Sequence, residues 1–403
     1  MRRVPLTPRA DWQAKVEAVG LTFHSPDAMA EHSRTYWDES ACYEFTAAEV
    51  DTLELAANQM QEMCLAAAQH VIDKKRYAEL EIPSAAIQAI EWSWNAEPPA
   101  IYGRFDFLYN GSEPPKLLEY NADTPTSLLE AAVVQWHWLE EVAGDLPADD
   151  HFLSFTAPKP DQFNSIHDRL IAKWKDIAPY LSAPLYFAGT EEPEDVLTLA
   201  YLEDTARQAG LQTHRIAMLD LGWNPDRNSF VDLDEEAIQS IFKLYPWETM
   251  MAEQFGPHAI ATCREMKWIE PIWKMLLSNK GILPILWELY PDHPNLLPSY
   301  FDRTSVALNM HDYIRKPMHS REGANITLVR NDSVITSTDG PYDGACIVQA
   351  IGPETTFAAA DGTARYPVLG VWMVDQECGG MGIRESTGPI TDNLSSFVPH
   401  YFR

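Results

Sequence analysis

The stretch Leu117-Leu118-Glu119-Tyr120-Asn121-Ala122-Asp123 decides how we expect this chain to fold. Its apolar and polar residues alternate, as they do upstream in Arg104-Phe105-Asp106, and this alternation is typical of β-strands. The link between the two runs, Asn110-Gly111-Ser112-Glu113-Pro114-Pro115, has the residue types of a hairpin turn. We therefore expect an antiparallel hairpin whose polar side chains lie together on one face.

The polar side chains of this hairpin suit a magnesium–nucleotide site. Asp106 and Glu119 supply two carboxylates, Asn121 an amide oxygen and Arg104 a guanidinium. Mg²⁺ prefers hard oxygen ligands, and arginine matches the geometry of phosphate. If the hairpin forms, these groups can converge on one metal-bound phosphate.

Size and composition indicate a globular protein with an unusual charge. The 403 residues allow one large domain or two modest ones, and 46% are hydrophobic. The net charge of −29 repels nucleic acid and anionic membranes, and attracts cations such as polyamines and Mg²⁺ complexes. Solubility alone explains the same charge equally well.

The ends and the cysteines favour a cytoplasmic location. The N-terminal run 1–8 carries two arginines but no apolar core, so it is not a signal peptide, and no run is long enough to span a bilayer. The five cysteines are scattered and lack metal-binding spacing. An odd number of scattered cysteines is typical of a reduced protein with free thiols.

The first half of the chain alternates helices and strands. Thr46 and Glu49 form a capping box for a helix to about Asp73, and a second long helix is expected over about 127–142. Strand 184–189, helix 193–209 and strand 213–219 then predict a small parallel α/β unit. No Gly-x-Gly-x-x-Gly follows its first strand, so the dinucleotide-binding fingerprint is absent.

The last third has the pattern of an antiparallel sheet that could surround a nucleotide. A strand ends at Lys316-Pro317, a polar loop 318–323 and a hairpin 324–337 follow, and Gln349 belongs to a further strand. A lysine at such a position can bind phosphates, Lys280 is a weaker case of the same kind, and the backbone beside Gln349 could pair with an adenine edge. A solvated lysine and an ordinary core strand are the open alternatives.

The segment from Gly379 to Glu385 is rich in glycine, and we expect a turn there. Its Arg384 could neutralise a phosphoryl group that is being transferred, because glycines allow the backbone to approach a ligand closely. A plain surface turn is the alternative.

Taken in order along the chain, these motifs resemble one family. The run 118–127 with Arg104-Phe105-Asp106, and then 278–280, 315–317, 382–385 and 396–400, is similar to the synthetase domain of glutathionylspermidine synthases and to stand-alone acid–amine ligase homologues. The resemblance spans nearly the whole chain, 1–403, as one synthetase unit. It implies a mixed α+β and α/β chain with an ATP-grasp fold and an additional small parallel α/β substrate domain at about 180–265. The nucleotide and metal site would use about 280–403 together with 100–130.

The resemblance also implies an activity and a role for each motif. An ATP- and Mg²⁺-dependent carboxylate–amine ligase would form an acyl phosphate, which an amine then attacks to give an amide, ADP and phosphate. The expected roles are metal binding by Asp106, Glu119 and Asn121, catalysis by Arg104 and Arg384, nucleotide binding by Lys280, Lys316 and Gln349, and substrate binding by Thr124, Thr126 and Arg321.

This chain departs from the family pattern in two places. It has no room for an amidase domain before the synthetase motifs, and Cys42 lacks a nucleophile context, so we expect no amidase activity. The loop 318–323 contains one glycine, Gly323, where a more glycine-rich lid is usual. Closure of this loop over ATP is therefore open.

The resemblance implies two small-molecule substrates: a carboxylate, of which glutathione or a peptide is an example, and an amine, of which a polyamine is an example. Glu191 and Glu192 could bind an ammonium group, but acids near a helix N-terminus are the favoured interpretation. A nucleotide-binding or polyamine-binding regulatory protein without turnover is the rival function. The intact set Asp106, Glu119 and Asn121 argues against the loss of turnover.

Overall fold

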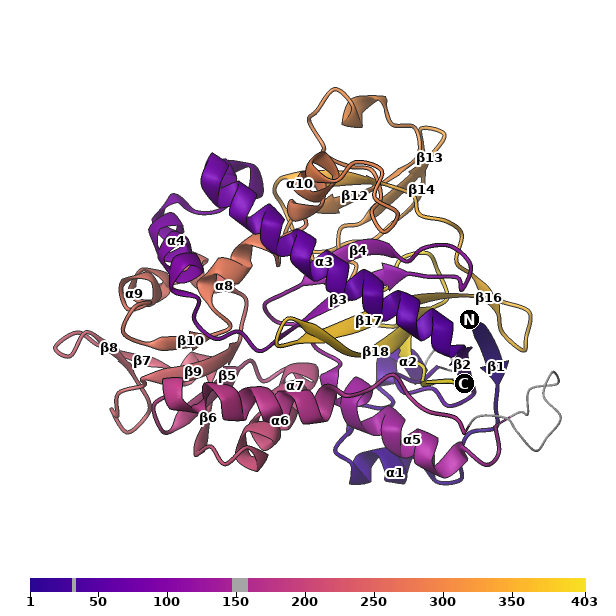
Figure 1. Ribbon diagram of the computed structural model, residues 1–403, viewed down its shortest axis with the longest axis horizontal. Helices are drawn as coiled ribbons and strands as arrows, with labels where there is room; N and C mark the ends of the chain where they lie inside the picture. Colours follow the sequence, from indigo (N-terminus) through magenta and orange to yellow (C-terminus); the bar gives the residue numbers. More distant parts are fainter. Residues whose placement is uncertain (31–33, 147–158) are drawn as a thin grey trace.

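A computed structural model describes residues 1–30, 34–146 and 159–403, and its centre is an antiparallel sheet. β3 (Tyr102–Leu108) and β4 (Lys116–Asn121) form the predicted hairpin, and the strand order is β19-β18-β17-β3-β4, with β16 (Phe357–Ala358) paired to β17 (Figure 1). The other members are β17 (Ala364–Val374), β18 (Glu377–Ser386) and β19 (Ser396–Phe397). Arg104 lies opposite Asn121, and Asp106 opposite Glu119, so the register brings the polar side chains together.

A second antiparallel sheet carries the predicted nucleotide motifs. Its order is β11-β15-β12-β13-β14, built from β11 (Ser299–Phe301), β12 (Tyr313–Pro317), β13 (Thr327–Arg330), β14 (Ser333–Ser337) and β15 (Cys346–Ala350). The 324–337 hairpin is confirmed, and Lys316 pairs with Ile347 one residue from the strand end. Lys316 is thereby held beside the central hairpin rather than in solvent.

A small parallel sheet forms a third layer at one end of the molecule (Figure 1). β10 (Lys267–Ile269), β9 (Ser240–Leu244), β5 (Leu185–Gly189) and β6 (Thr213–Ala217) lie in that order, and each neighbouring pair is parallel. α6 (Ile166–Ile177) and α7 (Pro193–Gln208) run beside it. The predicted strand–helix–strand unit is confirmed.

The longest helix, α3 (Ala47–Lys74), runs diagonally across the central sheet and contacts β17 and β18 (Figure 1). It begins at the predicted capping box, where Thr46 N donates to Glu49 Oε2 at 2.8 Å and Glu49 N donates to Thr46 Oγ1 at 3.3 Å. Its buried stripe includes Cys64, which is a core thiol. The helix thus covers one face of the sheet.

Shorter elements complete the fold and join the chain ends. β1 (Arg2–Pro5), β2 (Ala41–Phe45) and β20 (His400–Phe402) form a three-stranded sheet that links both termini (Figure 1). The remaining elements are α1 (Trp12–Ala18), α2 (Asp27–Ala30), α4 (Ile87–Ala96), α5 (Gln135–Val142), α8 (Trp247–Ala252), α9 (Gly256–Ala261), α10 (Ile282–Leu289), β7 (Gly222–Asn224) and β8 (Ser229–Val231). Among the described residues, no helix has both the length and the apolar character needed to cross a membrane.

The glycine-rich segment near Arg384 is a strand, so the predicted turn is wrong. It lies inside β18 and is almost wholly buried. A Cβ atom on Gly382 would lie 2.6 Å from the Phe397 ring, and one on Gly380 would lie 2.7 Å from the Phe163 carbonyl oxygen. These glycines therefore do not form a turn. Because they lack a side chain, they allow neighbouring groups to approach the strand closely.

The predicted helix over 127–142 is also altered. Its first part, Glu130–Val134, is a π-helical turn that continues into α5, and Ser127 lies before it with a left-handed φ of +66°. Single π-turns occur often at functional sites. Here the turn follows directly after residues that line the cavity described next.

Candidate active site

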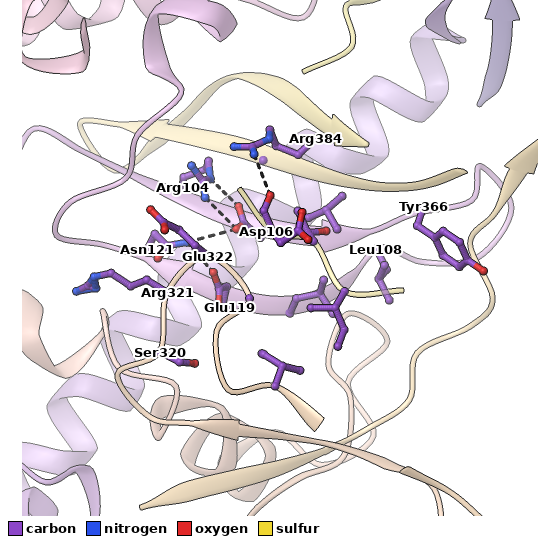
Figure 2. A pocket seen from close by; sticks show the side chains of 18 of the residues that line it. Arg104, Asp106, Leu108, Glu119, Asn121, Ser320, Arg321, Glu322, Tyr366 and Arg384 are labelled. Atoms are coloured by element: carbon purple, nitrogen blue, oxygen red, sulfur yellow. Dashed lines mark hydrogen bonds and ion pairs between the residues drawn. The ribbon is translucent and has the colours of Figure 1, made fainter. Parts of the chain in front are cut away.

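A cavity of about 660 Å³ lies between the central sheet and the second antiparallel sheet (Figure 2). Leu244, the last residue of β9, and Pro246, two residues further along the chain, also line it. Ten of the eleven residues expected to act in the site line this cavity: Arg104, Asp106, Glu119, Asn121, Thr124, Thr126, Lys280, Lys316, Arg321 and Arg384. Gln349 is not among the described residues that line it.

The hairpin side chains touch one another, as the strand register requires. Arg104 donates from Nε to Asp106 Oδ1 at 2.6 Å and from Nη2 to Oδ2 at 3.0 Å, and its Nη1 donates to the Thr126 carbonyl oxygen at 2.7 Å (Figure 2). Asn121 Nδ2 donates to Glu119 Oε1 at 2.9 Å and to Asp106 Oδ2 at 3.3 Å. Two carboxylates, an amide and a guanidinium therefore form one cluster.

Two lysines from other elements reach the same cluster. Lys280 Nζ lies 2.7 Å from Glu119 Oε2 and also donates to the Ser320 carbonyl oxygen. Lys316 Nζ donates to Gln349 Oε1 at 2.7 Å and to the Leu118 carbonyl oxygen at 3.2 Å. Gln349 thus orients a lysine that faces the cavity, instead of facing the cavity itself.

Burial and neighbouring charges shift the pKa values of these groups. Burial raises the pKa of Asp106, and the nearby Glu119 carboxylate adds to the rise against the effect of Arg104. Burial opposes ionisation of Glu119 as well, but Lys280 and Lys316 lower its pKa overall. Burial lowers the pKa of Lys316 to about 8. A phosphate beside Lys316 would favour its charged form and raise this pKa again.

The donor set fits a divalent cation shared with a ligand. Among the described residues, no group of three or more His, Cys, Asp and Glu side chains could hold a metal. Asp106 and Glu119 supply two carboxylates, and the Asn121 amide supplies a third oxygen when it turns its nitrogen away. Mg²⁺ is usually held by one or two carboxylates together with substrate phosphates, so this incomplete set suits magnesium better than a metal bound by protein alone.

Arg384 lies on β18, which β17 separates from the hairpin within the central sheet (Figure 2). It donates to the Ser395 and Asp392 carbonyl oxygens at 3.2 and 3.1 Å and to Ser127 Oγ at 3.4 Å, and its guanidinium stacks on the Tyr36 ring at 5.1 Å. Within the described part of the chain, its hydrogen-bond acceptors are all uncharged. An anion in the cavity would therefore replace uncharged acceptors rather than a hydrogen-bonded carboxylate.

The loop after Lys316 is held on two sides. Arg321 Nη2 lies 2.5 Å from Glu248 Oε1, and Asn393 Nδ2 donates to Glu322 Oε2 at 2.5 Å. Gly323 has a φ of +70°, and a Cβ atom there would lie 2.2 Å from the Thr391 carbonyl oxygen. The single glycine of the loop thus stands where the backbone passes closest to the C-terminal segment.

Acidic residues that the sequence analysis did not select also line the cavity, and two of them are neighbours on α7. Glu194 and Asp195, in the first turn of α7, line the cavity, whereas Glu191 and Glu192 are not among its lining residues. Thr126 Oγ1 donates to Glu194 at 3.4 Å, and burial raises the pKa of both new carboxyls. The predicted strand–helix–strand unit pointed to the start of α7, because ligands bind at the carboxyl ends of parallel strands, where α7 begins. It did not distinguish among the acidic residues there.

An apolar slot lies beyond the charged cluster, between the two antiparallel sheets. Its aliphatic walls come from both sheets and the segments next to them: Leu108, Leu118, Ile314, Ile326, Leu328, Ile335, Ile351 and Val368. The cavity therefore offers apolar and phosphate-binding surfaces side by side.

Comparison with known proteins identifies similar chains. Residues 3–403 match the family model described as "Glutathionylspermidine synthase preATP-grasp". A Haemophilus influenzae protein named "Putative acid--amine ligase" is 38% identical over 100% of both chains. Trypanothione synthetase of Crithidia fasciculata is 27% identical over 83% of this chain and 52% of its own length, so the chain spans about half of that longer relative.

The fold is also found among solved structures. The apo form of a glutathione synthetase-like effector from Globodera pallida superposes with a TM-score of 0.58, at 10% identity, over 98% of this chain and 96% of that one. At this identity the likeness concerns the fold alone.

Proposed function

The chain belongs to the glutathionylspermidine synthase family and is an acid–amine ligase, and from this premise we propose that it forms its C–N bond through an acyl phosphate made with ATP. The γ-phosphoryl group moves to a carboxylate, ADP leaves, and the amine displaces phosphate to give the amide. The observation that carries the proposal is the meeting of ten expected residues in one cavity. We further propose that the two antiparallel sheets are the ATP-grasp unit and that the parallel sheet, at about 180–265, is a substrate subdomain.

In this proposal the nucleotide lies between the two antiparallel sheets. Its base enters the apolar slot, with the backbone near Gln349 at the adenine edge, and Lys280 and Lys316 bind its phosphates. Asp106, Glu119 and Asn121 would hold Mg²⁺, which supplies charge neutralisation on the phosphate chain. The contact between Lys280 and Glu119 supports this assignment, because a lysine that binds a phosphate and a carboxylate that binds its metal have to be neighbours.

The acid substrate would bind on the side of Thr124, Thr126 and Arg321. Its reacting carboxylate then lies between Arg104, which is fixed by Asp106, and Arg384, whose hydrogen-bond acceptors among the described residues are all uncharged. Both guanidinium groups stabilise negative charge on the transferring phosphoryl group. Charge stabilisation of this kind is the main catalytic contribution in phosphoryl transfer.

The amine would enter beside Glu194 and Asp195. Glu322 lies close enough to raise the pKa of both carboxyls by repulsion, so several acids face one part of the cavity. Such a group of acids favours an ammonium or polyamine ligand. An amine attacks as the free base, and Glu194, which has a raised pKa, is placed to accept its proton.

We also propose that this chain lacks amidase activity. Cys42, Cys64, Cys346 and Cys378 are buried free thiols, and Cys263 is half-buried. Burial raises the pKa of each of the five thiols. A catalytic cysteine needs a lowered pKa, so none of the five resembles a nucleophile.

The test begins without an assumed substrate. The purified protein is incubated with ATP, Mg²⁺ and a metabolite extract, ADP is quantified, and new masses are sought; glutathione with spermidine is the first defined pair. We expect ADP and an amide whose mass equals acid plus amine minus water. The Asp106→Asn variant serves as the negative control. ADP formation equal to that of the control in every mixture would contradict the proposal.

A further inference from the structure

A buried ion pair outside the reacting cluster joins the central hairpin to the parallel sheet. Lys243 Nζ, at the end of β9, donates to Asp123 Oδ1 at 2.6 Å, and both side chains are wholly buried. Trp247 N, at the start of α8, donates to Asp123 Oδ2 at 3.1 Å, and the Lys243 ammonium lies 4.8 Å from the Trp247 ring centroid. Neither charged residue is among those that line the cavity.

A contribution to the stability of the fold is a poor explanation for an ion pair that is buried this deeply. Removing two charges from water costs several kcal/mol for each ion, and apolar replacements of such pairs are often neutral or stabilising. Burial accordingly raises the pKa of Asp123 and lowers that of Lys243, which shows how strongly the site disfavours charge. The pair is better explained by what it holds in place.

Two short connections lead from this pair to the acid side of the cavity. Along one, Asp123 directly precedes Thr124 and Thr126, the residues expected to contact the acid substrate. Along the other, the Trp247 amide on Asp123 fixes the first turn of α8, and the next residue, Glu248, pairs with Arg321 of the loop. Both parts of the expected acid site are therefore connected to the Asp123–Lys243 ion pair.

We propose that the Asp123–Lys243 ion pair is a positioning element that sets the Thr124–Thr126 segment and the Arg321 loop in register for the acid substrate. This inference rests on the proposed function for the identity of the substrate. It concerns residues that touch neither nucleotide nor metal in the proposed site. It therefore predicts an effect on acid binding that is separate from ATP binding.

The variants separate positioning from stability. Asp123→Asn and Lys243→Met each leave one buried partner unpaired and are expected to lose stability. The double variant Asp123→Asn/Lys243→Met has no unpaired buried charge and should recover most of its melting temperature. Glu203→Gln is the matched control, because Glu203 is a buried carboxylate of the same parallel-sheet region, paired with Arg207 and Arg215 but not among the cavity-lining residues.

The kinetic readout uses glutathione as the acid, spermidine as the amine and saturating ATP with Mg²⁺. In the double variant we expect KM for the acid to rise at least about tenfold, as a small displacement of positioning groups would cause, with KM for ATP within about twofold of the unchanged protein. The control should keep both values. A double variant with recovered stability and an unchanged acid KM would overturn the proposal.

Amide hydrogen exchange tests the inference even if no turnover is found. In the double variant, residues 247–252 and 318–325 should exchange at least about tenfold faster than in the unchanged protein, while the strands of the central sheet should not. The Glu203→Gln control should leave both segments unchanged. Equal exchange of these segments in the double variant and the unchanged protein would refute the positioning role, whatever the ligase assay shows.

Discussion

Lys316 is the residue whose charge responds most directly to pH in this cavity. Burial lowers its pKa to about 8, so the free protein loses this cation above that pH. A bound triphosphate raises the pKa again, and affinity therefore falls as pH rises from about 8 towards the higher pKa of the complex. From pH 7 to pH 9, we expect the affinity for ATP with Mg²⁺ to drop about tenfold, measured by calorimetry.

The matched variant for this prediction is Lys316→Arg, because arginine keeps its charge throughout this pH range. Its affinity should stay nearly flat between pH 7 and pH 9, even if it is weaker overall. If the ATP affinity of the wild-type protein also stayed constant between pH 7 and pH 9, Lys316 would not belong to the phosphate site.

The carboxylates of the hairpin provide a second prediction. Asp106→Asn or Glu119→Gln keeps the side-chain size but removes a negative oxygen ligand. We expect Mg²⁺-dependent ATP turnover to fall about 10²-fold or more, as losses of charge-stabilising groups usually do. Circular dichroism and the melting temperature should show a folded protein. Turnover within twofold of the unchanged protein, in either variant, would refute the metal assignment.

At the scale of single residues, much of the site could be predicted because residues that can bind a metal ion or a phosphate recur at the two-residue spacing of a β-strand. Asp106, Glu119 and Asn121 follow from strand alternation and one hairpin. Glu194 could not be selected over Glu191 and Glu192, because only the direction of α7 decides which acids face the cavity. Gln349 was expected near the nucleotide, but its side chain binds Lys316.

Among the elements, the pairing of β3 with β17 sets the position of Arg104. Gly370 lies opposite Asp106, and a Cβ atom on it would come within 2.7 Å of Arg104 Cδ. Gly370→Ala should therefore displace the guanidinium from Asp106 and Thr126 with little change in the strands themselves. We expect kcat to fall about tenfold or more, because a misplaced catalytic group is costly.

The control for that prediction is Gly388→Ala, a glycine whose added Cβ would have no neighbour within 4 Å. It should keep full activity. If Gly370→Ala retained kcat with an unchanged melting temperature, the close approach of β17 would not be what orients Arg104.

Elements with strong local signals could be predicted, whereas those set by tertiary packing could not. The α3 helix follows from its capping box and apolar stripe, and β5, α7 and β6 follow from apolar runs and a final glycine. The glycines of β18 suggested a turn, because sequence alone does not show that Phe163 and Phe397 press against that strand. The π-helical turn at Glu130 likewise has no local sequence signal.

For the whole molecule, the burial of the cysteines predicts that the chain does not hydrolyse amides by thiol chemistry. Incubation with glutathionylspermidine in the absence of ATP should release no spermidine above the rate in buffer, because burial raises the pKa of every cysteine. Chromatography of the free amine checks this. Release that iodoacetamide abolishes would show that one of these thiols is an active nucleophile.

The sequence alone says least about how the two antiparallel sheets and the parallel sheet are arranged around the cavity. Residues from about 100–130 and 280–403 meet at one cavity although nearly the whole parallel-sheet region lies between them in the chain. Local patterns predict each sheet, but the contact between sheets depends on long-range packing. The family resemblance supplied that contact as an expectation, and residues of both segments line the cavity.

The most direct test of the central claim follows the oxygen atoms of the acid. The acid of an active acid–amine pair is labelled with ¹⁸O in its carboxylate and incubated with the amine, ATP, Mg²⁺ and the protein. The mass of the released phosphate is then measured by mass spectrometry. An acyl phosphate requires that one labelled oxygen pass to each phosphate formed. Amide formation accompanied by unlabelled phosphate would contradict the account.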